Sequence, residues 1–268
     1  MSIGSCWRST CACAIYFVCK HYRWVSTGRG AARKISRGRA RRRVAKTTMG
    51  GSSPDLAPQI PMTDGDTQWV IALTGGPCAG KTTAMRRLQA HFGALGMRVY
   101  LVPEAATIMW ASGCEPSDLG LSEPRVAFQT GLMRLQLQLE DSIAAVARAN
   151  GTKAVLLCDR GLMDGKAYMS DAEWQRVLDN NKLAEEECNM RYDCVIHLVT
   201  AAEGASEHYV ASQLRRETAE QAVAVEKRTL EVWAGHLRRS VVDNSTGMDG
   251  KLARVVDAAS AVMLSSHC

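Results

Sequence analysis

Residues 70–83 read VIALTGGPCAGKTT, an apolar run followed by a glycine-rich turn and a lysine. Within this stretch, residues 75–82 match the pattern GxxxxGK[ST], whose glycines let backbone N–H groups approach phosphate oxygens closely. The helix that follows such a turn adds the positive end of its dipole to the same site. The stretch therefore predicts a phosphate-binding loop, or P-loop, between a buried strand and a helix.

This loop is expected to hold a nucleoside triphosphate with Mg²⁺. Lys81 would reach the β- and γ-phosphates, and the hydroxyl of Thr82 would bind the metal. The alternative is a glycine-rich turn without a ligand, which the preceding strand and the following helix disfavour. The expected nucleotide contacts are Gly75, Gly76, Pro77, Cys78, Ala79, Gly80, Lys81, Thr82 and Thr83.

Beyond the loop, short apolar runs alternate with longer amphipathic stretches, which is the pattern of a parallel sheet covered by helices on both faces. The sequence therefore predicts an α/β fold, a three-layer αβα P-loop NTPase with a five-stranded parallel sheet, similar to nucleotide kinases. The strands are expected at residues 69–74, 98–102, 154–158, 194–199 and 240–243.

Three longer helices are expected, the first of them between the second and third strands. Its apolar residues step by three or four positions and would form one buried face. These residues are Phe128, Leu132, Leu135, Leu139, Ile143 and Val146. Gly151 is placed to end this helix. The other two helices are expected at residues 217–237 and 249–264.

The third expected strand ends in an acid, Asp159, which would lie beside the P-loop at the carboxyl edge of the sheet. Asp159 has the features of a Walker B acid, which holds Mg²⁺ and orients or deprotonates an attacking hydroxyl. Arg160 would grip an acceptor phosphate or the transferring one. For Asp159 the alternative is an acid that caps a turn, and for Asp164 a metal-binding and a structural role are both open.

Glu104 follows the second expected strand and so reaches the same edge of the sheet. It is a candidate general base or indirect ligand of Mg²⁺. The alternative is an acid that stabilises the N-terminus of the next helix through the dipole, and the two roles are compatible.

Two later segments carry further candidates. Arg215 and Arg216 lie before a helix in a layout typical of a mobile lid, where one of them, Arg215, would stabilise a transferring phosphoryl group. Ordinary solvated arginines are the alternative. Asn244 follows the fifth strand, where P-loop kinases often contact the base, although it also suits a turn. The sequence has no guanine-reading NKxD motif, so ATP and GTP both stay open.

Charge is unevenly distributed along the 268 residues. Residues 1–48 hold twelve of the 33 basic residues and no acidic one, which leaves 21 basic and 27 acidic residues, a net charge of −6, for the rest. We therefore expect no nucleic-acid partner for the globular part. The Arg-, Ser- and Cys-rich tail is typical of a mitochondrial or plastid transit peptide, and the alternative is a cytoplasmic protein that starts at Met49.

Residues 49–66 are rich in Gly, Pro, Ser and Asp, a composition that buries too little apolar surface to order itself. We expect a disordered linker there and the P-loop domain at residues 67–268. The ten cysteines are scattered without CxxC spacing, which favours free thiols in a reducing compartment.

Six blocks along the chain carry a resemblance to a known family: TGGPCAGKTT, VPEAAT, CDRGLMDG, HLVTAAEG, RRETAEQA and VDNST. Over about residues 68–262 the chain resembles the AAA-type P-loop domain shared by NadR-like kinases and the TRPL translocation-defect family. The resemblance implies a nucleoside-kinase-like fold with Gly75, Gly80, Lys81 and Thr82 on phosphate. Larger relatives carry a CYTH-like domain after this one, which this chain is expected to lack.

Two functions follow from these motifs and this resemblance. The NadR-like relatives imply phosphoryl transfer to a small acceptor such as a nucleoside, with Lys81, Glu104, Asp159, Arg160 and Arg215 as catalytic residues. The animal relatives imply instead a GTP-binding regulatory module in phosphoinositide- or phosphatidic acid-linked trafficking, with an anionic phospholipid as partner. The insertion at residues 171–187 would roof an acceptor in the first case and carry an exposed patch in the second.

Overall fold

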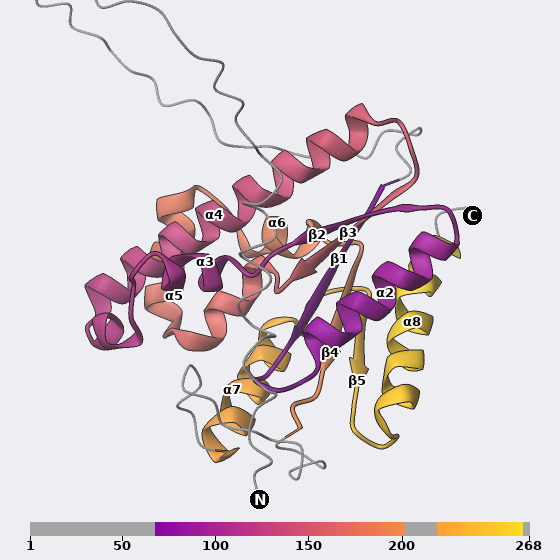
Figure 1. Ribbon diagram of the computed structural model, residues 1–268. Helices are drawn as coiled ribbons and strands as arrows, with labels where there is room; N and C mark the ends of the chain where they lie inside the picture. Colours follow the sequence, from indigo (N-terminus) through magenta and orange to yellow (C-terminus); the bar gives the residue numbers. More distant parts are fainter. Residues whose placement is uncertain (1–67, 202–218, 265–268) are drawn as a thin grey trace, which may run out of the picture. The chain divides into compact units, whose positions relative to one another are not determined.

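The computed structural model of the chain describes residues 68–201 and 219–264, and it confirms the α/β class. In these residues five parallel strands form one sheet in the order β2-β3-β1-β4-β5, with helices on both faces (Figure 1). The strands are β1 (Gln68–Gly75), β2 (Arg98–Val102), β3 (Ala154–Asp159), β4 (Cys194–Leu198) and β5 (Arg239–Val242). Each strand end lies within one residue of its expected position. The basic tail and the expected linker lie outside the described residues.

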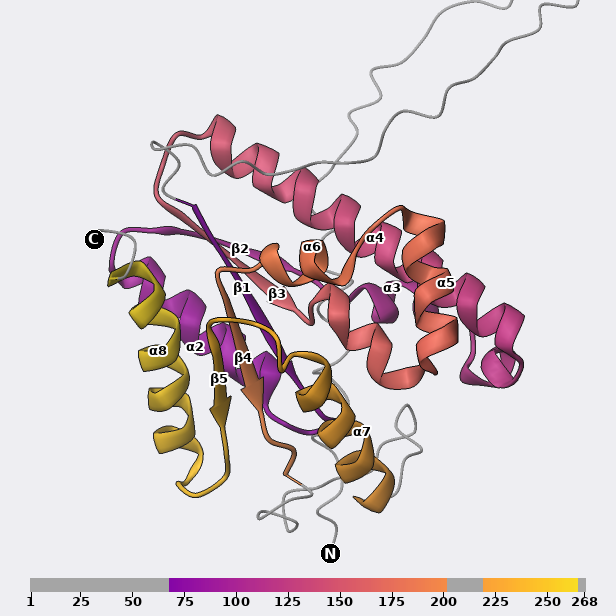
Figure 2. The same ribbon diagram turned by 180° about the vertical axis from the view of Figure 1, so that it is seen from behind.

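The helices fall on the two faces of this sheet. Seen from opposite sides in Figures 1 and 2, α2 and α8 lie on one face, and α4, α5 and α7 lie on the other. The α-helices are α2 (Lys81–Ala94), α3 (Ala105–Ala111), α4 (Ser122–Ala149), α5 (Asp171–Asn181), α6 (Glu185–Met190), α7 (Ala219–Val232) and α8 (Met248–Leu264). Two 3₁₀ helices, η1 (Pro116–Gly120) and η2 (Leu162–Tyr168), connect them. None of the helices in the described part of the chain is long and apolar enough to cross a bilayer.

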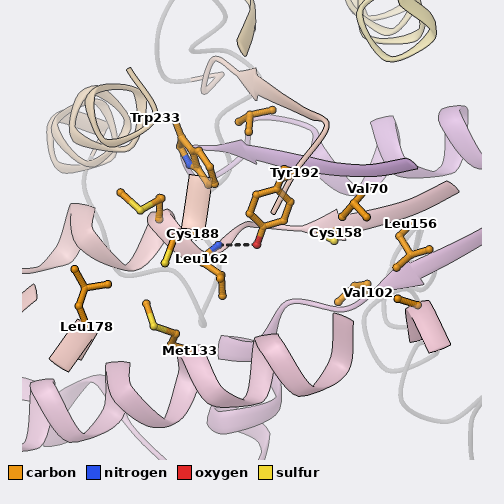
Figure 3. Close-up of a cluster of buried hydrophobic side chains, with 14 of the residues drawn as sticks. Val70, Val102, Met133, Leu156, Cys158, Leu162, Leu178, Cys188, Tyr192 and Trp233 are labelled. Atoms are coloured by element: carbon orange, nitrogen blue, oxygen red, sulfur yellow. Dashed lines mark hydrogen bonds between the residues drawn. The ribbon is translucent and has the colours of Figure 1, made fainter. Parts of the chain in front are cut away.

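The central strands are buried on both faces, which explains why they read as continuous apolar runs. One core lies between the sheet and α4, and Figure 3 shows Val70, Leu156, Met133 and Trp233 gathered in it. The second core lies under α2 and α8. Since carboxyl ends of parallel strands meet at one edge, the loops after β3 and β4 lie beside the P-loop, which follows β1.

The register of β1 requires a glycine at the point where the P-loop begins. Gly75 lies opposite Leu198 of β4, and its φ is +130°. A Cβ atom added there would lie 2.1 Å from the carbonyl oxygen of Leu198. Only glycine therefore lets β1 stay paired with β4 up to the first residue of the loop.

The long helix α4 forms where it was expected and ends before Gly151, but of the six apolar residues predicted to be buried only Phe128 is fully buried. Leu132, Leu135, Leu139 and Ile143 are half-buried, and Val146 is 54% exposed. The stripe that faces the core instead runs through Val126, Gln129, Met133, Gln136, Glu140, Ala144 and Ala147. A periodicity that counts only apolar residues misses this face because three of its members, Gln129, Gln136 and Glu140, are polar.

Glu140 is the centre of that polar stripe. Its carboxylate is 2% exposed and accepts from Arg191 Nε at 2.7 Å, from the Tyr192 hydroxyl at 2.9 Å and from Gln136 Nε2 at 2.8 Å. The Tyr192 hydroxyl in turn accepts from the backbone N–H of Leu162, drawn as a dashed line in Figure 3. This network joins α4 to the loop after β3. That loop carries Arg160 and Asp164, which lie near the carboxyl ends of the strands.

Replacing this buried acid is expected to destabilise the fold. Glu140→Gln leaves the largely buried Arg191 with only Asp141 as an acidic partner, so we expect the free energy of unfolding to fall by about 3 kcal/mol. Urea unfolding followed by circular dichroism measures it. The matched control is Glu123→Gln, which breaks an exposed pair with Arg176 and is expected to leave the midpoint unchanged. Equal midpoints for the two variants would contradict the structural role of Glu140.

Candidate functional site

The P-loop spans the turn between β1 and α2, as the motif predicts. Cys78 and Gly80 both adopt positive φ, +57° and +90°. Left-handed residues in a turn that opens a helix are typical of anion-binding nests of backbone N–H groups. The loop therefore has the conformation that binds phosphate, and the side chains of Thr82 and Thr83 at the start of α2 are exposed.

Lys81 folds back across the loop. Its ammonium donates to the carbonyl oxygens of Gly75 and Gly76, both at 3.1 Å. Desolvation and the nearby Arg160 lower the pKa of Lys81 to about 8, although Asp159 and Glu104 oppose the shift. The lysine is thus held over the first turn of the loop at the place where the motif requires a cation.

Asp159 ends β3 opposite Leu73 of the P-loop strand. Its Oδ1 is buried and has no hydrogen-bond partner among the described residues. Burial raises the pKa of Asp159, Lys81 opposes this shift, and Glu104 adds to it. A buried carboxylate oxygen without a donor is unfavourable, and a cation would relieve it.

This arrangement fits Mg²⁺. The Asp159 carboxylate and the exposed Thr82 hydroxyl are hard oxygen ligands of the kind Mg²⁺ prefers. Among the described residues no group of three or more His, Cys, Asp or Glu side chains could hold a metal by itself. The metal site would therefore be completed by phosphate oxygens and water, as is usual for Mg²⁺ bound with a nucleotide.

Arg160 links the ends of three strands. Its backbone N–H donates to Leu73 at 2.9 Å, its Nε donates to Glu104 Oε1 at 2.7 Å, and its Nη1 donates to the Gly75 carbonyl at 3.3 Å. Burial disfavours the charged forms of both Arg160 and Glu104. Tyr168 and Glu104 nevertheless raise the pKa of Arg160, and Arg160 lowers the pKa of Glu104. Both side chains therefore stay ionised near neutral pH.

Glu104 occupies the N-cap position of α3 without a side-chain capping bond. Its Oε2 accepts from the Thr107 hydroxyl at 2.7 Å, and about a third of its side chain is exposed, 30%. Its position at the N-terminus of α3 is compatible with the expected stabilisation of that helix through the dipole, and the carboxylate also lies at the open edge of the sheet beside Arg160.

Asp164 has a structural role. Its Oδ1 accepts from the Thr74 hydroxyl and from Trp233 Nε1, the latter at 3.0 Å, and its Oδ2 accepts from the Gly161 N–H at 3.0 Å. These donors come from β1, the turn after α7 and the loop after β3. The acid thereby ties these elements together, and of the two roles left open by the sequence this geometry supports the structural one.

Two other sequence candidates differ in what the structure says of them. Arg215 lies outside the described residues, as does Arg216. Asn244 is present, but its side chain connects loops: its Nδ2 donates to the Thr200 carbonyl at 2.7 Å, and its Oδ1 accepts from Lys251 at 2.7 Å. The insertion at residues 171–187 forms α5 and the first half of α6, and its Trp174 is buried against the protein's own core.

Sequence reasoning missed three residues that contact the P-loop or lie beside it. Thr200 donates its hydroxyl to the Pro77 carbonyl, and Lys251 donates to the Ala79 carbonyl at 3.0 Å. Glu226 accepts from the backbone N–H of Thr200 and lies beside Gly76, where an added Cβ would be 3.2 Å from it. The sequence does contain a sign that Lys251 and Glu226 have a special role, because each is a charged residue on the apolar stripe of its helix.

Comparison with known protein families supports the same assignment as the geometry. The model of one family, described as AAA domain, matches residues 70–251, which is more than half of the chain. Comparison with curated proteins finds no match.

Nucleotide affinity is expected to fall as the pH rises above 8. Since the pKa of Lys81 is about 8 in the free protein and a triphosphate stabilises the ammonium, binding takes up a proton near this pH. Raising the pH from 7 to 9 should weaken triphosphate binding about tenfold, whereas lowering it from 7 to 6.5 adds nothing from this group. Calorimetric titrations in buffers of different ionisation enthalpy measure both the affinity and the proton uptake. Constant affinity from pH 7 to 9 would overturn this account of Lys81.

Removing the charge of Asp159 should affect the metal more than the nucleotide. For Asp159→Asn we expect the gain in triphosphate affinity on adding Mg²⁺ to shrink about tenfold, with little change in the metal-free affinity. The control is Asp193→Asn, because Asp193 accepts from the Val70 N–H near the start of β1, at the opposite edge of the sheet. Equal Mg²⁺ dependence in Asp159→Asn and wild type would favour the turn-capping interpretation.

Proposed function

The chain belongs to the AAA domain family of nucleotide-binding P-loop proteins, and on that premise we propose that it transfers the γ-phosphoryl group of ATP or GTP to a hydroxyl of a small acceptor such as a nucleoside. The observation that carries this proposal is the Arg160–Glu104 ion pair at the edge of the sheet. A protein that only binds a triphosphate needs the P-loop and a metal ligand. A second ionised carboxylate, held beside them by an arginine, would supply a base for the hydroxyl of an acceptor.

Binding and orientation of the donor fall to the P-loop. Its backbone N–H groups and the N-terminus of α2 would hold the phosphates, and Lys81 would lie against the β- and γ-phosphates. Thr82 and Asp159 would hold Mg²⁺, which would supply positive charge to neutralise the phosphates. Arg160 contacts the Gly75 carbonyl of the same loop, so its guanidinium is within reach of the transferring group.

Glu104 is the better placed of the two acids to accept a proton. Asp159 offers its unpartnered oxygen to the metal, whereas Glu104 is partly exposed and is kept ionised by Arg160. The acceptor oxygen would form a bond to the γ-phosphorus while the bond to the leaving nucleoside diphosphate breaks. The hydroxyl proton would pass to Glu104, and Arg160 would stabilise the negative charge on the phosphoryl oxygens.

The acceptor class is the finer part of the proposal. It rests on the resemblance to NadR-like kinases, which implies a nucleoside such as nicotinamide riboside. The position of Glu104 is consistent with a hydroxylated acceptor, because a general base must reach the proton it removes.

The test uses the full chain with Mg²⁺ and either ATP or GTP, offered pooled nucleosides, nucleoside monophosphates and nicotinamide riboside, with products read by mass spectrometry. A phosphorylated acceptor is expected from wild type and none from Lys81→Ala. Glu104→Gln should lower kcat by about a hundredfold or more, because it removes the proton acceptor, while triphosphate affinity stays unchanged. The Asp193→Asn variant, altered near the start of β1 at the opposite edge of the sheet, is the control and should retain full activity.

The outcome that would sink the kinase proposal is triphosphate binding without any product. Vesicles that contain phosphoinositide or phosphatidic acid, tested for nucleotide-dependent binding of the chain, would then examine the regulatory alternative. Product formation with normal kcat in Glu104→Gln would retain the kinase but remove the role given to Glu104.

A further inference from the structure

Three side chains from two loops and one helix meet behind the P-loop. Thr200 follows β4, Asn244 follows β5, and Lys251 lies in the first turns of α8. Lys251 donates to Val199 at 2.8 Å and to Asn244 Oδ1 at 2.7 Å, and Asn244 donates to the Thr200 carbonyl at 2.7 Å. We call Thr200, Asn244 and Lys251 the rear cluster.

The rear cluster reaches two carbonyl oxygens of the P-loop. The Thr200 hydroxyl donates to Pro77, and the Lys251 ammonium donates to Ala79 at 3.0 Å. Each carbonyl belongs to a peptide unit whose N–H is that of the next residue, Cys78 or Gly80. In a trans peptide the C=O and N–H groups point in opposite directions. A donor that holds the carbonyl from behind therefore directs the N–H to the other side of the loop.

These two peptide units also directly precede the two residues of the loop that have a left-handed backbone conformation. Cys78 has φ +57° and Gly80 has φ +90°. For a residue other than glycine this conformation costs about 1–2 kcal/mol, and it persists where the surroundings hold it. The hydroxyl of Thr200 is a direct contact that holds the peptide unit before Cys78.

Lys251 is an unusual residue for this position unless its charge has a use. It is 3% exposed, and its stem lies on the apolar stripe that α8 presents to the core with Val255 and Ala259. Burial lowers the pKa of Lys251 to about 8, while Glu226 opposes the shift. Three oxygen acceptors satisfy its three donors, so the buried ammonium is a complete hydrogen-bonded unit.

We infer that Thr200, Asn244 and Lys251 are positioning residues, which hold two peptide units of the P-loop in the phosphate-binding orientation before the nucleotide arrives. Lys251 also places a positive charge behind the loop, where it adds to the attraction for a triphosphate. The inference rests on nucleotide binding and is independent of whether an acceptor is phosphorylated. It assigns Asn244 to the phosphate side of the site, whereas the sequence pattern suggested contact with the base.

The test compares four variants of the full chain: Lys251→Met, Thr200→Val, Thr200→Ser and Arg254→Met. Arg254 is the matched control, because it lies on α8 and binds the Asp243 carboxylate and carbonyl in the β5–α8 loop without contacting the P-loop. Dissociation constants are measured by calorimetry for ATP, GTP and inorganic tripolyphosphate. Thermal melts establish the temperature range in which each variant is folded, and titrations are done within it.

We expect Kd for all three ligands to rise about tenfold in Lys251→Met and in Thr200→Val. Thr200→Ser, which keeps the hydroxyl, should bind as wild type does, and Arg254→Met should lower the melting temperature without changing Kd. If Lys251→Met does not fold, the Thr200 pair decides. A lower melting temperature with unchanged Kd in Lys251→Met and Thr200→Val would overturn the inference. It would also be overturned by a loss confined to the nucleotides and not shared by tripolyphosphate, which would mean that the cluster acts on the base.

Discussion

Every P-loop amide that turns its N–H toward a phosphate points a carbonyl oxygen the other way, and a buried carbonyl needs a donor. In this protein four side chains supply those donors. Lys81 binds the carbonyls of Gly75 and Gly76, Arg160 also binds that of Gly75, Thr200 binds that of Pro77, and Lys251 binds that of Ala79. They come from the start of α2, the loop after β3, the loop after β4 and α8. The conformation of one short loop thus depends on elements spread over most of the described sequence.

The same edge of the sheet divides into two chemically different halves. On the side of β2 and β3 lie the carboxylates of Glu104 and Asp159 with Arg160, which suit metal binding and proton transfer. On the side of β4 and β5 lie Thr200 and Lys251, which hold the loop backbone. This division explains why β1, which carries the P-loop, is in the centre of the sheet, since from there both halves reach the same phosphates.

Buried polar groups connect this edge to the interior. The Tyr192 hydroxyl binds both Glu140 of α4 and the Leu162 N–H after β3, and Trp233, which directly follows α7, binds Asp164 in the adjoining 3₁₀ helix. Such contacts contribute modest free energy individually, but leaving one member unpaired costs about 1–3 kcal/mol. The loop that carries Asp159 and Arg160 is therefore fixed by the core on which it lies, which keeps the charged groups in register with the P-loop.

The sequence alone determined the P-loop, the five strands and the meeting of Glu104 and Asp159 at one edge, because each depends on a local pattern and on the rule that parallel strands end together. Only the tertiary structure decided which face of α4 is buried, what Asp164 does and which residues support the loop from behind. Glu140, Asp164 and Lys251 are charged residues, which ordinarily lie at the surface, and they are buried because their partners come from distant segments. The energy of a buried charge depends on those partners, and one stretch of sequence does not specify them.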